Sequence, residues 1–286
     1  MKSLFTTVVI AFFFSSCFLS KPKQVSELEN AICGLDNVSN YQAYLNQIID
    51  LQKAHPEKEK KPITFDVKFN VIRPLEGTSL TEEDFSPLLA YMNASFEEAN
   101  ISFKNSNETQ YIFSGAPVDV FYHNRILERE ITRNSYDPST INIYIVENTD
   151  QVVGFTHYPI ENSQRLFIAR EKLFDPSLIH ELGHFFGLLH TFEQNDRPAE
   201  KKLTCEIDGD KICDTPLDVP GGASFIESDC SLFGDYKDTN GHSYKPDLNN
   251  FMSYYGSCRT RFSPQQLDRM YFIAKNIKSF QMRSKV

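Results

Sequence analysis

The sequence predicts an α+β fold, in which a mixed sheet packs against a few helices and an irregular C-terminal part follows. Residues 63–71 (ITFDVKFNV) place an apolar side chain at every second position, which is the period of a half-buried strand. Residues 175–186 begin with Asp-Pro, a typical helix start, and Gly187 is placed to end that helix. Residues 191–250 are rich in Asp, Gly, Pro and Asn and lack a regular period, so we expect irregular structure there.

The remaining elements follow from the same criteria, in chain order. Residues 41–55 have helical spacing of apolar side chains and lead into a charged linker, residues 55–62, with a proline near each end. A long helix is expected within 79–100, with Thr81 as its N-cap. A last helix follows Ser263, which forms a capping-box pattern with Gln266. Short strands are expected within residues 101–103, 111–115, 141–146 and 153–159.

Composition limits the class of protein. The chain has 286 residues, 41% of them hydrophobic, and a formal net charge of −9. This composition suits one domain of medium size with a short appendage and excludes a disordered chain. The only basic block is the short KEKK at 58–61, so the acidic balance argues against a nucleic-acid partner.

The N-terminus has the features of an export signal. Residues 1–17 contain a lysine and then an apolar run that is too short for a transmembrane helix and ends in small residues. The final FSSC resembles a bacterial lipobox, in which Cys17 would carry a lipid, although Phe14 stands where leucine is usual and ordinary signal cleavage stays open. We therefore expect a secreted or cell-surface protein, either extracellular or a bacterial lipoprotein of the outer membrane.

Export changes the interpretation of the six cysteines, because disulfides persist in oxidising compartments. Without Cys17, four cysteines cluster in the last third of the chain and allow three connectivities: Cys205, Cys213, Cys230 and Cys258. Cys33 is left over. It lies in the polar stretch 18–60, which we interpret as a pro-segment with a processing site in the linker 55–62.

Residues 180–190, HELGHFFGLLH, predict a catalytic zinc site. His180 and His184 lie one turn apart on one helix face and can bind the same ion. The turn at Gly187 would let His190 supply the third ligand, leaving the open fourth position that catalytic zinc needs. Glu181 is offset from the ligand face and is placed to act as general base on a metal-bound water. The alternative is an aromatic core helix with incidental histidines, which this spacing disfavours.

Several motifs carry a family resemblance. HELGHFFGLLH matches the HExxHxxGxxH signature of metzincin metalloproteases, and NNFMSYYGSC at 249–258 resembles their Met-turn. Together with INIYIV, GFTHYP, HTF, DGDKICDTP and RFSPQQLDRM, these stretches resemble the pappalysin family, near its ulilysin-like members of the cytophagalysin type. The resemblance implies a metzincin-type zincin catalytic domain at residues 61–286, with a twisted mixed sheet, backing and active-site helices and an irregular C-terminal subdomain.

The resemblance also implies an activity and roles for named residues. The chain would be an exported zinc-dependent endopeptidase, with protein or peptide substrates, acting as a monomer. Met252 would lie beneath the zinc, and Tyr254 would stabilise the oxyanion, unless it is an ordinary core tyrosine. Residues 153–159 would form the edge strand that pairs with an extended substrate. MSYYGSC lacks the acidic residues that follow the Met-turn in other members, so the resemblance does not carry a preference for arginine.

Three further features rest on the resemblance. It implies the disulfides Cys205–Cys230 and Cys213–Cys258. It implies that Cys33, in AICGLDN, is a latency residue whose thiolate occupies the fourth zinc position in the zymogen, the alternative being a bystander or an intermolecular disulfide partner. It also implies a calcium site in DGDKICD, although short acidic loops can equally be solvated turns; the candidate ligands are Asp208, Asp210 and Asp214.

Other functions fit parts of the pattern. A zinc hydrolase acting on a non-protein amide would need the same site. A binding lipoprotein that keeps the fold without catalysis is disfavoured by the presence of Glu181. A structural zinc module is disfavoured because such sites are usually closed by four ligands, often cysteines.

Overall fold

The computed structural model describes residues 33–34, 38–57, 59–75, 80–106, 109–147, 151–159, 164–193, 205–206, 209–219, 226–232, 234–237 and 240–278. The predicted signal peptide, including Cys17, and Asp208 of the predicted calcium site lie outside these residues. Cys33 and Gly34 are described by their backbone.

One mixed sheet organises the molecule. Its strand order is β1-β6-β7-β5-β2-β3, and β4 pairs with β2 beyond the end of β3. All neighbouring strands are parallel except β6 and β7, which confirms the predicted mixed sheet. The strands are β1 Cys33–Gly34, β2 Ile63–Arg73, β3 Ile101–Asn105, β4 Gln110–Phe113, β5 Ile141–Val146, β6 Gly154–Thr156 and β7 Leu166–Ala169.

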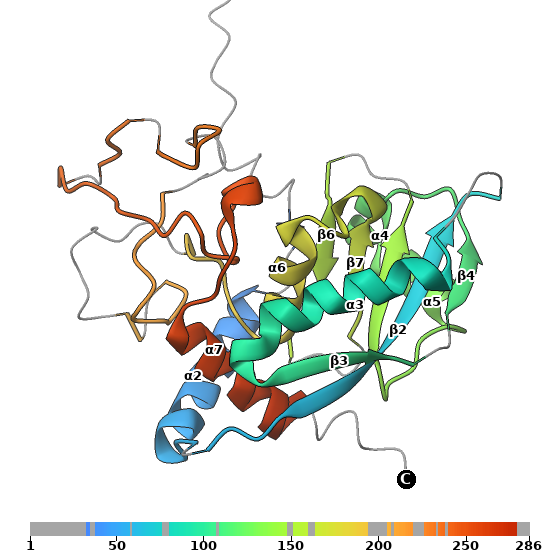
Figure 1. Cartoon of the computed structure of the whole chain (residues 1–286), viewed down its shortest axis with the longest axis horizontal. Coiled ribbons are helices and arrows are strands. Elements are labelled where there is room, and N and C mark those ends of the chain that lie inside the picture. The colour runs from blue at the N-terminus through green and yellow to red at the C-terminus, as the bar shows by residue number, and fades with distance from the viewer. Residues whose placement is uncertain are drawn as a thin grey trace, which may run out of the picture.

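Helices cover both faces of this sheet (Figure 1). The α-helices are α2 Val38–Ala54, α3 Glu82–Phe96, α4 Val118–His123, α5 Arg125–Thr132, α6 Pro176–Phe185 and α7 Pro264–Ile273. Short 3-10 turns occupy Glu97–Ala99, Arg170–Lys172 and Gly256–Cys258, and a π-helical turn, Ala274–Lys278, extends α7. Helices α3 and α6 share one apolar core with the sheet, and α4 packs in a second core on the other face.

Strand β2 departs from the half-buried strand that its sequence predicts. The alternating pattern holds only at its start, and residues 67–72 are all buried. Phe69 stacks on Phe85 of α3 at a ring-centroid distance of 4.3 Å, whereas Ile72 belongs to the opposite core with Phe121 of α4. The strand is central because β5 and β3 flank it, so both of its faces are covered.

The predicted helix starts are confirmed. Thr81 is the N-cap of α3, and its backbone N–H donates to Asp84 Oδ2 at 2.7 Å. Ser263 and Gln266 form the predicted capping box at the start of α7, with N–H to oxygen distances of 3.2 and 2.8 Å. Among the described residues between 191 and 250 there is neither an α-helix nor a strand, as predicted.

The disulfide pairing implied by the family resemblance is wrong. The bonds join Cys205 to Cys213 and Cys230 to Cys258, with Cα atoms 5.1 and 5.7 Å apart. The first pairing has a local cause, because Gly209 and Lys211 adopt left-handed backbone conformations and the chain turns back within eight residues. Closing loops of 8 and 28 residues contributes about 2.5 and about 3.6 kcal/mol in a chain-entropy treatment.

Helix α2 lies beside α7 and packs into the folded domain (Figure 1), although it comes from the stretch that the sequence suggests is a pro-segment. It contributes buried apolar side chains to a third core. That core comprises Tyr41, Leu45, Ile48, Ile49, Tyr158, Leu189, Phe272 and Ile273.

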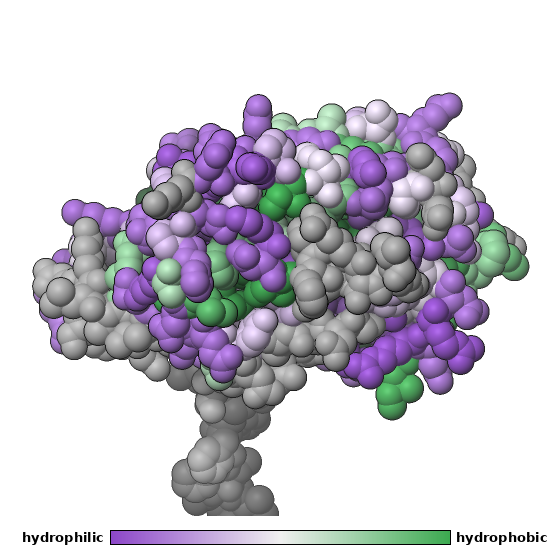
Figure 2. Space-filling view, turned by 90° about the horizontal axis from the view of Figure 1, so that it is seen from below, coloured by the Kyte–Doolittle hydropathy of each residue, from purple (hydrophilic) through white to green (hydrophobic). Residues whose placement is uncertain are grey.

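The surface is mainly hydrophilic on the face shown in Figure 2, where hydrophobic residues form small separate areas. Scattered apolar residues of this kind are usual on a protein surface and need no partner. No helix among the residues searched for membrane spans is long and apolar enough to cross a bilayer.

Candidate metal centre

Helix α6 carries the first half of the predicted metal motif. Asp175 caps it by accepting a hydrogen bond from Ser177 N at 3.0 Å, and Pro176 occupies the first turn, as predicted. Gly187 follows the helix with φ +86°, a conformation that favours glycine. The chain reverses there, so that His190 returns to the helix face that presents His180 and His184.

The three imidazoles meet at one point. His184 Nε2 lies 3.0 Å from His180 Nε2 and 3.1 Å from His190 Nε2. His180 Nδ1 lies 2.7 Å from the carbonyl oxygen of Phe251, and His184 Nδ1 lies 2.7 Å from that of Leu188. A carbonyl oxygen can only accept, so Nδ1 carries the proton in both rings, and both Nε2 lone pairs point at the common centre.

Burial keeps these imidazoles neutral. It lowers the pKa of His184 to about 4, and it lowers the pKa values of His180 and His190 well below the usual range, with further lowering from the neighbouring histidines and Arg259. Neutral imidazole is the form that binds metal ions. Facing lone pairs repel one another, so a cation between them is the arrangement that makes this geometry favourable.

The donor set fits zinc. Zinc binds imidazole nitrogen at about 2.0–2.1 Å, and tetrahedral ligands at that distance are about 3.4 Å apart, close to the separations found here. Within the described parts of the chain, this is the group of histidine, cysteine and acidic residues able to surround a metal ion. Three nitrogen ligands leave one position for water and substrate.

The segment that resembles a Met-turn packs against α6. A Cβ atom at Gly183 would collide with Met252 Sδ, so glycine at this position lets α6 rest on the methionine. Arg259 holds the turn together: its guanidinium donates to the carbonyl oxygens of Gly256 at 2.8 Å and Ser253 at 3.2 Å, and to Ser177 Oγ in α6 at 3.3 Å. The sequence did not point to Arg259, because nothing local distinguishes it from a surface arginine.

The two predicted catalytic side chains lie beside the histidines. The Tyr254 hydroxyl is 3.1 Å from His190 Nε2, and its ring packs edge-on against the His190 ring. Glu181 is buried next to His180, and a Cβ atom placed on Gly154 of β6 would lie 3.2 Å from Glu181 Cγ. The Glu181 side chain therefore packs against β6, the strand at which the family resemblance places the substrate. The prediction that this strand is the sheet edge is wrong in the full chain, because β1 pairs with it.

Asp218, which the sequence did not single out, links two parts of the site. Its carboxylate is buried and accepts three hydrogen bonds. The donors are Thr191 Oγ1 at 2.5 Å, the Tyr255 hydroxyl, and Val219 N at 2.7 Å. Thr191 follows His190, and Tyr255 follows Tyr254. One carboxylate thus holds the segment with the third ligand against the segment with the tyrosine. Burial raises the pKa of Asp218 to about 6, although its hydrogen bonds oppose the shift.

In the predicted calcium site, the carboxylates of Asp210 and Asp214 accept hydrogen bonds from other residues of the protein. Asp210 accepts from Ile212 N at 3.1 Å and Thr215 Oγ1 at 2.7 Å. Asp214 accepts from Ser263 Oγ at 2.6 Å and from Gln265 N at 2.8 Å at the start of α7. These bonds favour the structural interpretation of both residues, and calcium binding stays a prediction.

Comparison with known proteins identifies the family. The pregnancy-associated plasma protein-A family, peptidase M43, matches residues 126–274, which is just over half of the chain. The chain belongs to this family. It is a metalloprotease with a metzincin fold, as the sequence predicts, and the histidine triad implies zinc.

Individual relatives agree. The chain is 27% identical over 236 residues to an extracellular metalloprotease of Arthroderma gypseum, covering 74% of this chain and 72% of that one. It is 25% identical over 241 residues to an extracellular metalloprotease of Arthroderma benhamiae, covering 76% and 74%. The fold is similar to that of Tannerella forsythia mature mirolysin in complex with a cleaved peptide, with a TM-score of 0.56 and 16% identity over 79% of this chain and 97% of that one.

Asp218 should give the stability a measurable dependence on pH. Its pKa is about 6 in the folded protein against an ordinary value of 3.8, so its stabilising contribution is complete below about pH 4 and is lost as the pH rises through about 6. An asparagine side chain at this position cannot ionise. We expect the unfolding free energy of zinc-free Asp218→Asn, relative to wild type, to rise by roughly 2.5 kcal/mol between pH 4 and pH 7, because each pKa unit corresponds to about 1.36 kcal/mol and a small part of the effect is already present at pH 4.

Urea unfolding of both proteins at four pH values in that range measures the difference. Asp229→Asn is the control: Asp229 is fully exposed, and hydrogen bonds from Ser231 lower its pKa, so its variant should show no such rise. A difference between Asp218→Asn and wild type that is independent of pH would contradict the assignment.

Proposed function

We propose that the chain is an exported zinc-dependent endopeptidase, which hydrolyses peptide bonds in protein substrates by means of a metal-activated water and a glutamate general base. One observation carries the proposal: the Nε2 atoms of the buried His180, His184 and His190 converge on a single centre, and the buried Glu181 follows the first of these ligands in α6. The names of the extracellular relatives support secretion and proteolysis.

His180, His184 and His190 would hold the zinc. Bound there, zinc supplies Lewis acidity, which lowers the pKa of a ligated water towards roughly 7 and polarises the scissile carbonyl. Glu181 would take the proton from that water and deliver it to the leaving amine, because it is buried and directly follows the ligand His180 in α6. The Tyr254 hydroxyl, next to His190, would donate a hydrogen bond to the developing oxyanion.

Export is part of the proposal. The apolar residues 1–17 predict a signal peptide, and the relatives are named as extracellular enzymes. The FSSC sequence supports the finer proposal that a lipid on Cys17 retains the protein at the membrane surface.

Glu181→Gln tests the role of the base. The amide cannot accept a proton, whereas the three ligands are unchanged, so we expect kcat/KM for a casein-derived peptide to fall by about 10²–10⁴-fold with zinc still bound in a 1:1 ratio. Peptide cleavage and metal analysis of the same samples measure both quantities.

Glu171→Gln is the matched control, because Glu171 is exposed just before α6 and should retain full activity. Cleavage by Glu181→Gln at the wild-type rate would contradict the general-base assignment. Normal zinc content without cleavage of any peptide by the wild type would instead favour a non-protein amide substrate.

We also propose that the precursor is latent through Cys33. Strand β1 lies at the outer edge of the sheet and pairs with β6, with Cys33 opposite Gly154, the residue that packs against Glu181. An extended substrate added at this edge would need the same backbone groups of β6. The Cys33 thiolate would suit zinc as a fourth ligand and would displace the catalytic water.

Cys33→Ala in the full-length precursor should therefore cleave peptides, and process itself, earlier than the wild-type precursor. A time course of peptide cleavage with parallel gel analysis measures this. Cys33→Ala combined with Glu181→Gln is the control that separates self-processing from contaminating proteases. A Cys33→Ala precursor that stays as latent as wild type would rule out the thiol as the latency device.

A further inference from the structure

We propose that helix α2 is a permanent part of the catalytic domain, which holds the Gly187 turn of the metal centre, so that maturation removes only chain that precedes α2. The proposal rests on the proposed zinc centre and refines the extent of the pro-segment. It makes Tyr41 a positioning residue for the zinc ligands, although Tyr41 precedes the first long strand of the domain by more than twenty residues.

The contact at the turn is direct. Tyr41 is fully buried, and its hydroxyl donates to the Gly187 carbonyl oxygen at 2.6 Å. A Cβ atom at Gly187 would lie 2.5 Å from the Tyr41 hydroxyl and would collide with Ile273 Cδ1 of α7. The turn that brings His190 back to α6 is thus enclosed between α2 and α7. The space next to Gly187 is filled by side chains of α2 and α7.

A second set of contacts reaches a ligand from the same tyrosine. The Tyr41 ring stacks on Tyr158 with centroids 4.1 Å apart and planes 9° apart. Tyr158 in turn packs edge-on against the His184 imidazole, with centroids 5.8 Å apart. Tyr158 follows strand β6 by two residues, so α2 supports both a metal ligand and the end of the strand that packs against Glu181.

The interface of α2 resembles a domain interior. Tyr41, Leu45 and Ile48 are at most 1% exposed, and their partners include Leu189, which immediately precedes His190. Removal of α2 would expose this apolar surface directly behind the metal ligands, a liability for a secreted enzyme. Strand β1 differs, because it pairs with the sheet edge over only two residues.

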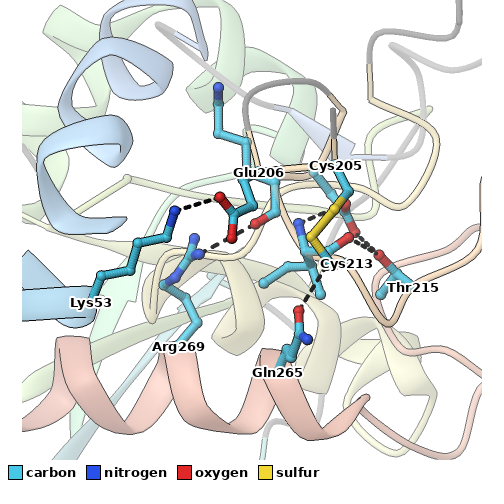
Figure 3. The surroundings of a disulfide bond; sticks show 10 residues. Lys53, Cys205, Glu206, Cys213, Thr215, Gln265 and Arg269 are labelled. Atoms are coloured by element: carbon cyan, nitrogen blue, oxygen red, sulfur yellow. Dashed lines mark hydrogen bonds and ion pairs between the residues drawn. A yellow bond between two sulfur atoms is a disulfide. The ribbon is translucent and has the colours of Figure 1, made fainter. Parts of the chain in front are cut away.

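Polar contacts also involve the C-terminal half of α2, and Figure 3 shows the one between Lys53 and Glu206. Lys53 Nζ lies 2.5 Å from Glu206 Oε2, in the loop that the Cys205–Cys213 disulfide closes. Arg269 Nε of α7 donates to Gln52 Oε1 at 2.9 Å. The C-terminal half of α2 therefore contacts both the disulfide-closed loop and α7.

The linker that follows α2 is also bound to the domain. Lys61 N donates to the Tyr271 hydroxyl at 2.8 Å, and Lys60 Nζ lies 2.6 Å from Asp268 Oδ1. A protease that cuts in the linker would have to detach these contacts, and its cut would not release the buried helix. The packing thus favours a removable segment shorter than residues 18–60.

Zinc affinity tests the positioning role. In full-length chain carrying Cys33→Ala, so that only the histidines set the affinity, we expect Tyr41→Ala to raise the zinc dissociation constant by about tenfold or more, the range typical of groups that orient metal ligands. Tyr41→Phe, which keeps the stack and loses the hydrogen bond to Gly187, should give a smaller increase. Competition with a chromophoric chelator measures the constants.

Gln47→Ala, on the exposed face of the same helix, is the matched control and should bind zinc as the parent does. A Tyr41→Ala variant that loses thermal stability in its zinc-free form but binds zinc as the parent does would overturn the positioning role. If Tyr41→Ala does not fold, Tyr41→Phe decides: parental zinc affinity in that variant overturns the role of the hydrogen bond.

The intact mass and N-terminal sequence of the processed enzyme test the boundary. We expect the processed enzyme to begin at or before Val38 and so to contain α2, whereas an active enzyme that begins after Tyr41 would overturn the proposal. If the chain is not a peptidase, the wild type will bind zinc normally but cleave no peptide. That outcome differs from a loss of zinc affinity in the Tyr41 variants and from an N-terminus that lacks α2, so the two proposals are tested separately.

Discussion

Three imidazole nitrogens that face one another with their lone pairs repel unless a cation lies between them. Here the rings of His180, His184 and His190 are buried, neutral and held in that arrangement by backbone carbonyl oxygens behind the first two. The surrounding structure holds the three rings close together. The α6 helix supplies two ligands at a fixed spacing, and the turn at Gly187 supplies the third.

Support for the ligands comes from segments far apart in the chain. Arg259 holds the Met-turn against the start of α6, and Asp218 holds Thr191 and Tyr255 together. From helix α2, Tyr41 donates a hydrogen bond to the Gly187 turn. These contacts share a principle: a buried polar group satisfies the backbone or hydroxyl groups next to a ligand, and so limits the positions that the ligand can adopt.

Local chemistry made much of the molecule predictable. Asp175, Thr81 and Ser263 cap helices as expected, because a cap depends on residues within three or four positions. The metal ligands were predictable for the same reason: two lie on one helix, and a glycine brings back the third. Strand β7 and helices α4 and α5 were missed, because their apolar patterns are short and their burial comes from tertiary packing.

Long-range contacts set the limit of prediction. The disulfide pairing followed from a left-handed turn at Gly209 and Lys211, which the family resemblance did not convey. Asp218 and Arg259 resemble ordinary surface residues in the sequence, and only the fold buries them among partners. Helix α2 was recognised as a helix, but its apolar face alone could not show that its partner is the metal-binding turn.

The zinc K-edge X-ray absorption spectrum of the processed enzyme tests the central claim most directly. The convergence of three Nε2 atoms predicts one zinc per chain, with three imidazole nitrogens and one oxygen ligand at about 2.0–2.1 Å. A first shell without imidazole scattering, or one dominated by sulfur, would contradict it.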